Sequence, residues 1–391
     1  MSEEIKGTIT DIDALIGVCK RLEDAKLLAF DFETTGLNII EAVPVGISLA
    51  SDNGVVVYIP FIHNGVSCLD IGLVMANLKP IFIKDGIIII AHNFVFDIQF
   101  LWKDCDIDIG WKFDEGLAAD TQIMSWLDNE NRDSHGLKQL AKAILKINMT
   151  NFDDLTKGTK FIDLPIDTAA KYGMLDSLAT LQLFKVFLER LERQNLLDVF
   201  WKVEMPYTKV LALMKRRGVY VNTDLLDVYE LRIDKELGEL TGRLTELAGK
   251  EININSGDQL GRLLFGNPPD GFGAPIHGYT AGGKKPRKDG TIAPPKPKTD
   301  KGVIAFLASH DGMPWQEFCK VLIRYKALAK INSTYIKGLR QLINSDGKVR
   351  CNFFQTGTVT GRLSSSDPNL QNQPSGSIWV DKYYIGKSYS K

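Results

Sequence analysis

The sequence predicts an α/β domain, a mixed sheet flanked by helices, followed by a mainly helical region. Runs of β-branched and aromatic residues separated by turn residues fill the first quarter of the chain, which is typical of strands. Helical periodicity dominates further along. The length of 391 residues exceeds what one hydrophobic core usually supports, so two or three domains are expected.

The α/β part comes first. Strands are expected at 27–32, 42–50 and 55–60, where turn residues such as "SDNG" separate the runs into a meander. "LDIGLVMANLKPIF" predicts a helix, "DGIIIIAHN" a buried strand, and "FVFDIQFLWKD" a helix that begins where that strand ends. Residues 120–195 are mostly helical by periodicity.

The second part is more helical. Leucine spacing over 225–250 predicts one long amphipathic helix. Ser256 and Gln259 have the spacing of a capping box, which predicts a helix start. Residues 266–302 are rich in Gly, Pro and Lys and predict an exposed, mobile basic loop. The sequence contains no internal repeat.

Composition narrows the class of protein. With 44% hydrophobic and 24% charged residues, the chain has the composition of an ordinary soluble protein. The five cysteines are scattered without a metal-binding or redox spacing, as suits a reducing compartment. The polar start "MSEEIKGTIT" and the short aliphatic run "IIIIA" predict neither a standard export signal nor a membrane span. A cytoplasmic protein with no membrane partner is expected.

The net charge of −1 hides a division between the two halves. Residues 1–200 carry 18 Lys and Arg against 30 Asp and Glu, whereas residues 201–391 carry 29 against 18. A cation-binding half joined to a polyanion-binding half would have this asymmetry, although chance drift or acidic surface helices would produce it too. Charge alone leaves a nucleic-acid partner open.

Asp31 and Glu33 in "LLAFDFETTGLN" lie at the end of an apolar run. In an extended strand, residues i and i+2 project from the same side, so the two carboxylates share one small patch. They repel each other unless a proton, a basic side chain or a metal ion neutralises them.

Two further pairs bring more oxygen atoms. Asn93 and Asp97, and likewise Tyr172 and Asp176, are four residues apart, which places each pair on one face of a helix. Either pair alone has an ordinary alternative, a solvated surface aspartate or a helix cap. Taken in order after the three-strand meander, the pairs predict a site for hard divalent cations, which several carboxylates bind.

"DFETTGL", "HNFVFD" and "YGMLD" resemble the three motifs of the DEDDy group of 3′–5′ exonucleases, and the later sequence narrows this to family A DNA polymerases of the bacterial polymerase I type. The resemblance implies a ribonuclease H-like exonuclease domain that uses two divalent ions, Mg²⁺ or Mn²⁺. It makes Tyr172 a catalytic residue that orients the attacking water. It implies four metal ligands, Asp31, Glu33, Asp97 and Asp176, and two nearby DNA contacts, Leu37 and Asn93. Sheet-edge packing is the alternative role for Leu37.

The basic half resembles the same family. Segments between 214 and 339 are similar to the polymerase thumb, and "TGTVTGRLSSSDPNLQNQP" (356–374) closely resembles its template-primer binding motif. Donor side chains there suit minor-groove acceptors that every base pair presents, so binding would not depend on sequence. The alternative is a turn-rich loop whose polar residues cap one another. The DNA-binding residues implied by this motif are Thr360, Arg362, Ser364, Asn369, Gln371 and Asn372.

After this motif the resemblance ends, without the acidic palm strand and fingers helix of the family. The resemblance therefore predicts an exonuclease domain at 1–197, a thumb-like DNA-binding region at 198–350, and the template-primer motif, start of palm and tail at 351–391. Palm and fingers are expected on a second polypeptide, which the aromatic tail around Trp379 and Tyr383 could help to bind. Nucleotide incorporation by this chain alone is not expected.

The leading hypothesis is a metal-dependent 3′–5′ exonuclease that proofreads DNA during replication, one part of a split or truncated polymerase. It would bind single-stranded 3′ ends and primer-template duplex. The alternatives are a free-standing nuclease and a non-catalytic DNA clamp or scaffold. Metal bound among the four carboxylates would favour catalysis, and lysines there would favour the scaffold.

Overall fold

The computed structural model describes residues 4–282, 292 and 294–373. They form two compact units, each made of two stretches of chain. The first contains residues up to Val219 and Arg350–Gln371, and the second contains Tyr220–Val349 and the residues from Asn372. The sequence-based borders at 197 and 350 stay predictions. No helix among the described residues is long and apolar enough to cross a membrane.

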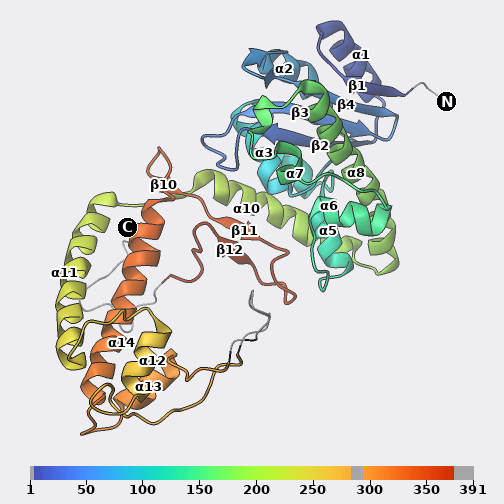
Figure 1. The fold of residues 1–391 in the computed structure, drawn as a ribbon. Coiled ribbons are helices and arrows are strands. Elements are labelled where there is room, and N and C mark those ends of the chain that lie inside the picture. The colour runs from blue at the N-terminus through green and yellow to red at the C-terminus, as the bar shows by residue number, and fades with distance from the viewer. Residues whose placement is uncertain (1–3, 283–291, 293, 374–391) are drawn as a thin grey trace. The chain divides into compact units, whose positions relative to one another are not determined.

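A six-stranded mixed sheet forms the centre of the first unit, in the order β1-β4-β3-β2-β7-β8 (Figure 1). β2, β3 and β4 run antiparallel as the predicted meander, while β7 and β8 continue the sheet in parallel from β2. The α/β class is therefore confirmed. The strands are β1 (Ile5–Thr8), β2 (Leu27–Thr34), β3 (Pro44–Ser51), β4 (Val55–Pro60), β7 (Ile88–Ala91) and β8 (Ala118–Asp120); β5 (Ile62–His63) and β6 (Val66–Ser67) form a small separate pair.

Helices cover this sheet. α8 packs on β2, β3 and β4, and α3 packs on β2 and β7. The α-helices of the unit are α1 (Ile12–Leu22), α2 (Ile71–Phe82), α3 (Phe94–Lys103), α4 (Gly110–Asp114), α5 (Thr121–Asp128), α6 (Leu137–Leu140), α7 (Phe152–Thr156), α8 (Ile166–Arg193), α9 (Leu197–Val199) and α10 (Met205–Arg217). Two π-helical segments, Ala141–Leu145 and Phe200–Glu204, and a 3₁₀ turn, Phe161–Asp163, complete it.

Strand β2 has two chemically different faces, because successive side chains of a strand point to opposite sides. The Phe30 ring packs edge-on against Phe82 of α2 and lies 5.5 Å from Phe94 of α3, between ring centroids. Asp31 and Glu33 project from the opposite face, on which α8 lies. The apolar face thus anchors the strand while the acidic face remains available for chemistry.

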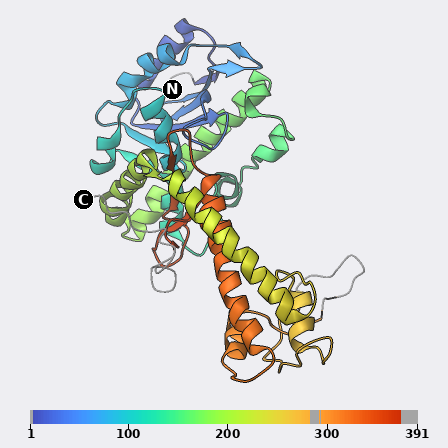
Figure 2. The same ribbon diagram turned by 90° about the vertical axis from the view of Figure 1, so that its left-hand side faces the viewer.

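The second unit is mainly helical, as predicted. α11 (Thr223–Ala248) and α14 (Gln316–Lys330) lie side by side in both views (Figures 1 and 2). The other elements are α12 (Gly257–Phe265), α13 (Lys301–Ala308), a π-helical segment (Ile331–Lys337), α15 (Gly338–Arg340) and β10 (Lys348–Val349). The strand β9 (Val219–Tyr220) lies where the chain passes from one unit to the other.

The capping box predicted for α12 forms only in part. The Ser256 side chain accepts from the Gln259 N–H, as predicted, but the Gln259 side chain accepts from the Asn253 N–H instead of that of Ser256. Between 266 and 300 the described residues contain no helix or strand beyond a single bridge between Tyr279 and Pro297. Residues 283–291 of this loop, and the tail with Trp379 and Tyr383, lie outside the described residues.

Candidate active site

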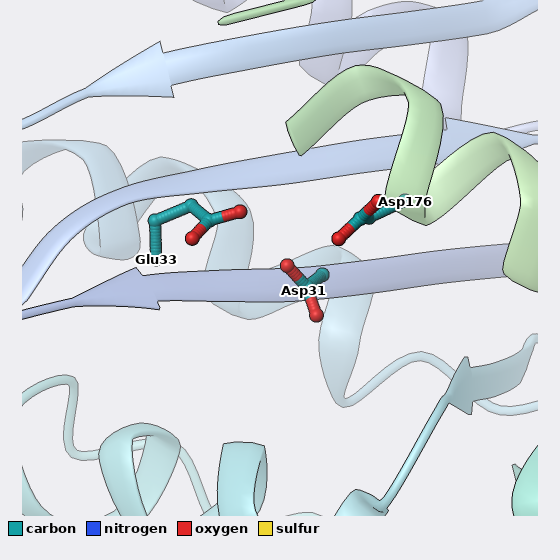
Figure 3. A group of neighbouring side chains, drawn as sticks. All are labelled: Asp31, Glu33 and Asp176. Carbon is teal, nitrogen blue, oxygen red and sulfur yellow. The ribbon is translucent and has the colours of Figure 1, made fainter. Parts of the chain in front are cut away.

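β2 and α8 bring three carboxylates together. One oxygen from each of Asp31, Glu33 and Asp176 lies within 4.8 Å of the others, where α8 passes over the sheet (Figure 3). Asp31 is opposite Ser48 and Glu33 is opposite Gly46 in the register of β2 with β3, so the two acids share one face. Three of the four predicted ligands, Asp31, Glu33 and Asp176, are therefore close enough to share one cation.

The close approach of α8 depends on a glycine one turn before Asp176. A β-carbon at Gly173 would lie 3.1 Å from a Tyr58 ring carbon and 3.4 Å from the Ser48 β-carbon. Tyr58 and Ser48 belong to strands β4 and β3 and are fully buried, so they have little room to move. Gly173 thereby lets the helix lie low enough on the sheet to bring Asp176 to the acidic face.

Asp97 lies beside this group of three but is not a member of it. Its Oδ1 accepts a hydrogen bond from the Phe32 N–H at 3.0 Å, between the two acids of β2 in sequence. β7 pairs only with the first residues of β2, Leu27 to Ala29, so the later backbone N–H groups on that side need other acceptors. The Asp97 side chain is buried, with 2% of the residue exposed, and it holds the end of β2 by bonding the backbone of that strand.

The start of α3 is fixed by a residue that sequence reasoning missed. Asp120, at the end of β8, accepts the N–H groups of Asn93 at 3.1 Å and Phe94 at 2.7 Å. Asn93 takes a left-handed backbone conformation, with φ of 67°, between β7 and α3. Asp120 could have been noticed as an acid at the start of the region expected to be helical, but its pairing with a segment 27 residues away has no local signal.

Crowding and burial disfavour the charged forms of the carboxylates. Burial, and then the charge of Asp176, raises the pKa of Asp31 to about 7. Burial raises the pKa of Asp176 to about 6, against the opposing effect of Lys138. Burial, followed by the charge of Asp31, raises the pKa of Glu33 well above its ordinary value, and burial does the same for Asp97. Ionising the whole group at neutral pH therefore needs additional positive charge.

This carboxylate group fits a divalent cation by the chemistry of its donors. Oε1 of Glu33 is buried and has no hydrogen-bond partner among the described residues. Hard cations such as Mg²⁺ and Mn²⁺ take carboxylate oxygens as ligands, and several acids in one site supply the charge they need. Asp31, Glu33 and Asp176 are the residues that could hold such an ion.

Lys138 is the second residue that sequence reasoning missed. It lies on α6, and its ammonium forms an ion pair with the Asp176 carboxylate. The same Nζ lies 4.0 Å from the centroid of the Tyr172 ring. Tyr172 lies one turn before Asp176 on α8, and burial raises the pKa of its phenol, which therefore stays neutral. Lysine in an expected helical region is ordinary, so no feature of the sequence predicted this contact.

Three of the predicted template-primer residues, Thr360, Arg362 and Ser364, lie in a separate hairpin of the first unit, formed by β11 (Asn352–Phe354) and β12 (Ser364–Ser366), and Asn369 and Gln371 follow it. Thr360 and Arg362 are exposed in its connecting loop, where the Arg362 carbonyl accepts from the Thr358 hydroxyl at 2.7 Å. The neighbouring predicted residues have partners within the protein. Ser364 pairs with Phe354 in the two-stranded sheet. The Asn369 Oδ1 accepts from the Ser365 hydroxyl and from the Gln371 N–H, each at 3.0 Å. In the second unit, the Asn372 carbonyl accepts from the Tyr335 hydroxyl at 2.6 Å.

Three side chains of the helical elements hold this hairpin. The Trp126 Nε1–H of α5 donates to the Thr358 carbonyl at 3.1 Å. Gln355, which is 7% exposed, accepts from the Thr208 hydroxyl at 2.9 Å and donates to the Glu204 carboxylate at 2.6 Å. The predicted DNA-binding hairpin is thus packed within the same compact unit as the carboxylate site.

Comparisons with known proteins find two family matches along the chain. Residues 7–192 match the family described as 3′-5′ exonuclease, and residues 223–383 match the family described as DNA polymerase family A. DNA polymerase I of Pseudomonas aeruginosa is 32% identical over 364 residues, which are 91% of this chain and 37% of that protein. DNA polymerase I of Chloroflexus aurantiacus is 32% identical over 374 residues, 94% of this chain and 37% of that protein.

The chain belongs to DNA polymerase family A. It spans just over a third of the length of these curated relatives. A solved structure, the POL domain of Pol1 from M. smegmatis in complex with DNA primer-template and dNTP, shares the fold with a TM-score of 0.73 at 20% identity, covering 95% of this chain and 57% of that one.

Within this family A chain, the structure brings together the acids of the first and third predicted motifs, and Asp97 of the second motif lies beside them through its bond to the Phe32 N–H. Tyr172 lies beside Asp176 through the shared Lys138 contact. Leu37 is 85% exposed between β2 and β3, so it packs on little of the protein and stays available for contact. The metal, catalytic and DNA-binding roles of these residues remain predictions.

Proposed function

We propose that this chain is a metal-dependent 3′–5′ exonuclease that removes nucleotides from the 3′ end of DNA, and that it serves as the proofreading part of a family A polymerase in the cytoplasm. The observation that carries this proposal is the group of three carboxylates with a buried, unpartnered Glu33 oxygen. Membership of the chain in family A supports the choice of DNA as substrate.

The chemistry follows from the donor set. Two divalent ions, Mg²⁺ or Mn²⁺, would supply a water of lowered pKa and positive charge near the phosphate and the leaving 3′ oxygen. Asp31, Glu33 and Asp176 would hold them, with Asp97 beside the group. The neutral phenol of Tyr172 can hydrogen-bond to a water at the edge of the group without adding negative charge. The exposed Leu37 side chain would contact the terminal bases of the strand.

The first test is hydrolysis of single-stranded DNA labelled at its 3′ end, in the presence of Mg²⁺ or Mn²⁺. Release of labelled mononucleotides is expected, and Asp31→Ala should abolish it without loss of the folded state. Asp24→Ala is the matched control, because Asp24 is an exposed acid in the turn before the same strand. A well-folded wild-type protein that releases nothing with either ion would overturn the proposal.

A second candidate, a non-catalytic DNA clamp or scaffold, is favoured by the ion pair of Lys138 with Asp176. A lysine in the acidic group neutralises part of its charge without a metal. This candidate predicts that the protein binds neither Mg²⁺ nor Mn²⁺ at the group and that Asp31→Ala leaves DNA binding unchanged. Titration with Mn²⁺ distinguishes the two candidates, because binding removes the electron paramagnetic resonance signal of the free ion.

We also propose that the hairpin residues Thr360 and Arg362 contact primer-template duplex, and that palm and fingers elements beyond these residues are needed for DNA synthesis. Those elements would lie on a longer chain or on a second polypeptide. The proposal is supported by the share of the relatives' length that this chain spans, 37%. The chain alone should incorporate no nucleotide on a primed template, and measurable incorporation would contradict this.

A further inference from the structure

Lys138 brings a positive charge to the group of three carboxylates. Its Nζ pairs with Asp176 and also lies 4.0 Å from the centroid of the Tyr172 ring, so it contacts two of the residues proposed for the exonuclease reaction. Its side chain is 17% exposed, which keeps the ammonium within the site instead of in bulk solvent. The Lys138 charge favours the ionised forms of Asp31, Glu33 and Asp176 alike.

The backbone around Lys138 is held by local bonds. The Ser125 hydroxyl and His135 Nδ1 are hydrogen-bonded at 2.9 Å, and the Gly136 N–H donates to the Ser134 hydroxyl at 3.1 Å. The four-carbon side chain of lysine, by contrast, is flexible and carries three rotatable donors. A change of partner by Lys138 therefore needs only rotation of its side chain.

Counting charges suggests what that change of partner does. The acids Asp31, Glu33, Asp97 and Asp176 carry four negative charges when all are ionised, and two divalent ions would balance them. Lys138 then has no acid left to neutralise, while a DNA strand in the site would bring a further phosphate charge. An ammonium beside a phosphate in a partly buried site forms a strong, charge-assisted hydrogen bond.

We infer that Lys138 competes with divalent ions for Asp176 in the free protein and, once ions are bound, supplies its charge to a phosphate of the DNA strand. This inference rests on the proposed exonuclease function. The Tyr172 ring keeps the Lys138 ammonium within reach of both Asp176 and the DNA phosphate, because the face of an aromatic ring attracts a cation. Lys138 is thus a residue that tunes metal affinity and positions the strand.

The test compares Lys138→Met, Lys138→Arg and a control, Lys142→Met, in the full chain. Lys142 is an exposed lysine one turn further on. Mn²⁺ affinity is measured by titration without DNA. Loss of the competing ammonium should tighten Mn²⁺ binding of Lys138→Met by about tenfold, which corresponds to ~1.4 kcal/mol. Lys138→Arg and Lys142→Met should bind Mn²⁺ as the wild type does.

The second readout is the rate of mononucleotide release at saturating Mn²⁺. Lys138→Met should be slower than the wild type, although it binds the ion more tightly, and Lys138→Arg should retain most of the rate. A purely structural role for Lys138 would not tighten Mn²⁺ binding. Mn²⁺ affinity of Lys138→Met equal to or weaker than that of the wild type would overturn the inference.

The outcomes separate this inference from the proposed function. A wild-type chain that neither binds Mn²⁺ nor releases nucleotides refutes the exonuclease proposal itself. A wild-type chain that does both, with unchanged affinity in Lys138→Met, refutes only the role of Lys138. If thermal unfolding shows that Lys138→Met does not fold, Lys138→Gln is titrated in its place and the same tightening is expected.

Discussion

Replacing Asp31 by asparagine should stabilise the metal-free protein while abolishing its activity. Burial and the neighbouring acid raise the pKa of Asp31 from its ordinary value of 3.8 to about 7. The folded state therefore retains a proton that the unfolded state releases. The contribution of this group to stability is fully present below about pH 4 and is lost as the pH rises to about 7. At pH 8 the ionised Asp31 destabilises the fold, and asparagine removes that charge.

The size of the effect follows from the two pKa values. Their difference of roughly 3 corresponds to ~4 kcal/mol, at about 1.4 kcal/mol for each pKa unit. A proton on Asp31 also lowers the repulsion that Asp176 and Glu33 experience, so the free-energy cost of ionisation is shared among the three acids. We therefore expect Asp31→Asn to raise the free energy of unfolding by ~2 kcal/mol at pH 8. For a unit of this size that raises the unfolding temperature by about 4–8 °C.

The assay is differential scanning calorimetry in EDTA at pH 8 and pH 5. The gap between Asp31→Asn and the wild type should narrow at pH 5, because the folded wild type then keeps its proton. Mg²⁺ should narrow it at pH 8, because an ion that binds the folded wild type stabilises it. Asp24→Asn, on the surface, should change neither value. An Asp31→Asn variant that is no more stable than the wild type at pH 8, or whose gain is the same at both pH values, would refute this reasoning.

Two further predictions concern hydrogen bonds. Asp97→Ala leaves the buried Phe32 N–H without its acceptor, whereas Asp97→Asn keeps an acceptor oxygen. The alanine variant should therefore lose ~1–3 kcal/mol more of the free energy of unfolding than the asparagine variant, as chemical denaturation can measure. Equal losses would show that the Phe32 hydrogen bond contributes nothing to stability. Arg362→Ala should weaken primer-template binding by ~1.5–3 kcal/mol about equally for all sequences and reduce its salt dependence, as anisotropy titrations at several salt concentrations can show. A change in sequence preference instead would contradict the minor-groove interpretation.

The sequence predicted the elements whose signals are local. The meander of β2, β3 and β4 follows from runs of β-branched and aromatic residues between turn residues, and the helix α3 follows from helical periodicity. Asp31 and Glu33 follow from their i, i+2 spacing on β2. β1 was missed because its four residues, "IKGT", carry no strong pattern and depend on pairing with β4. The strands β11 and β12 are three residues each, too short to stand out in a polar segment.

Contacts between distant segments could not be predicted. Lys138 of α6 reaches Asp176 of α8 across 38 residues, and Trp126 reaches Thr358 across 232 residues. Such pairs depend on how the helices pack, and the periodicity of a sequence does not predict this packing. The same holds for Asp97, whose spacing from Asn93 predicted a helical face but not its bond to the backbone of β2.

The most direct test of the proofreading account is the rate at which the last nucleotide leaves a 3′-labelled primer annealed to its template. A site that takes a single-stranded 3′ end acts faster on a mismatched terminus, because that end separates from the template more readily. We predict faster release from the mismatched primer than from the paired one in Mg²⁺, and no release in EDTA or with Asp31→Ala. Equal rates on the two primers, or release that persists with Asp31→Ala, would contradict it.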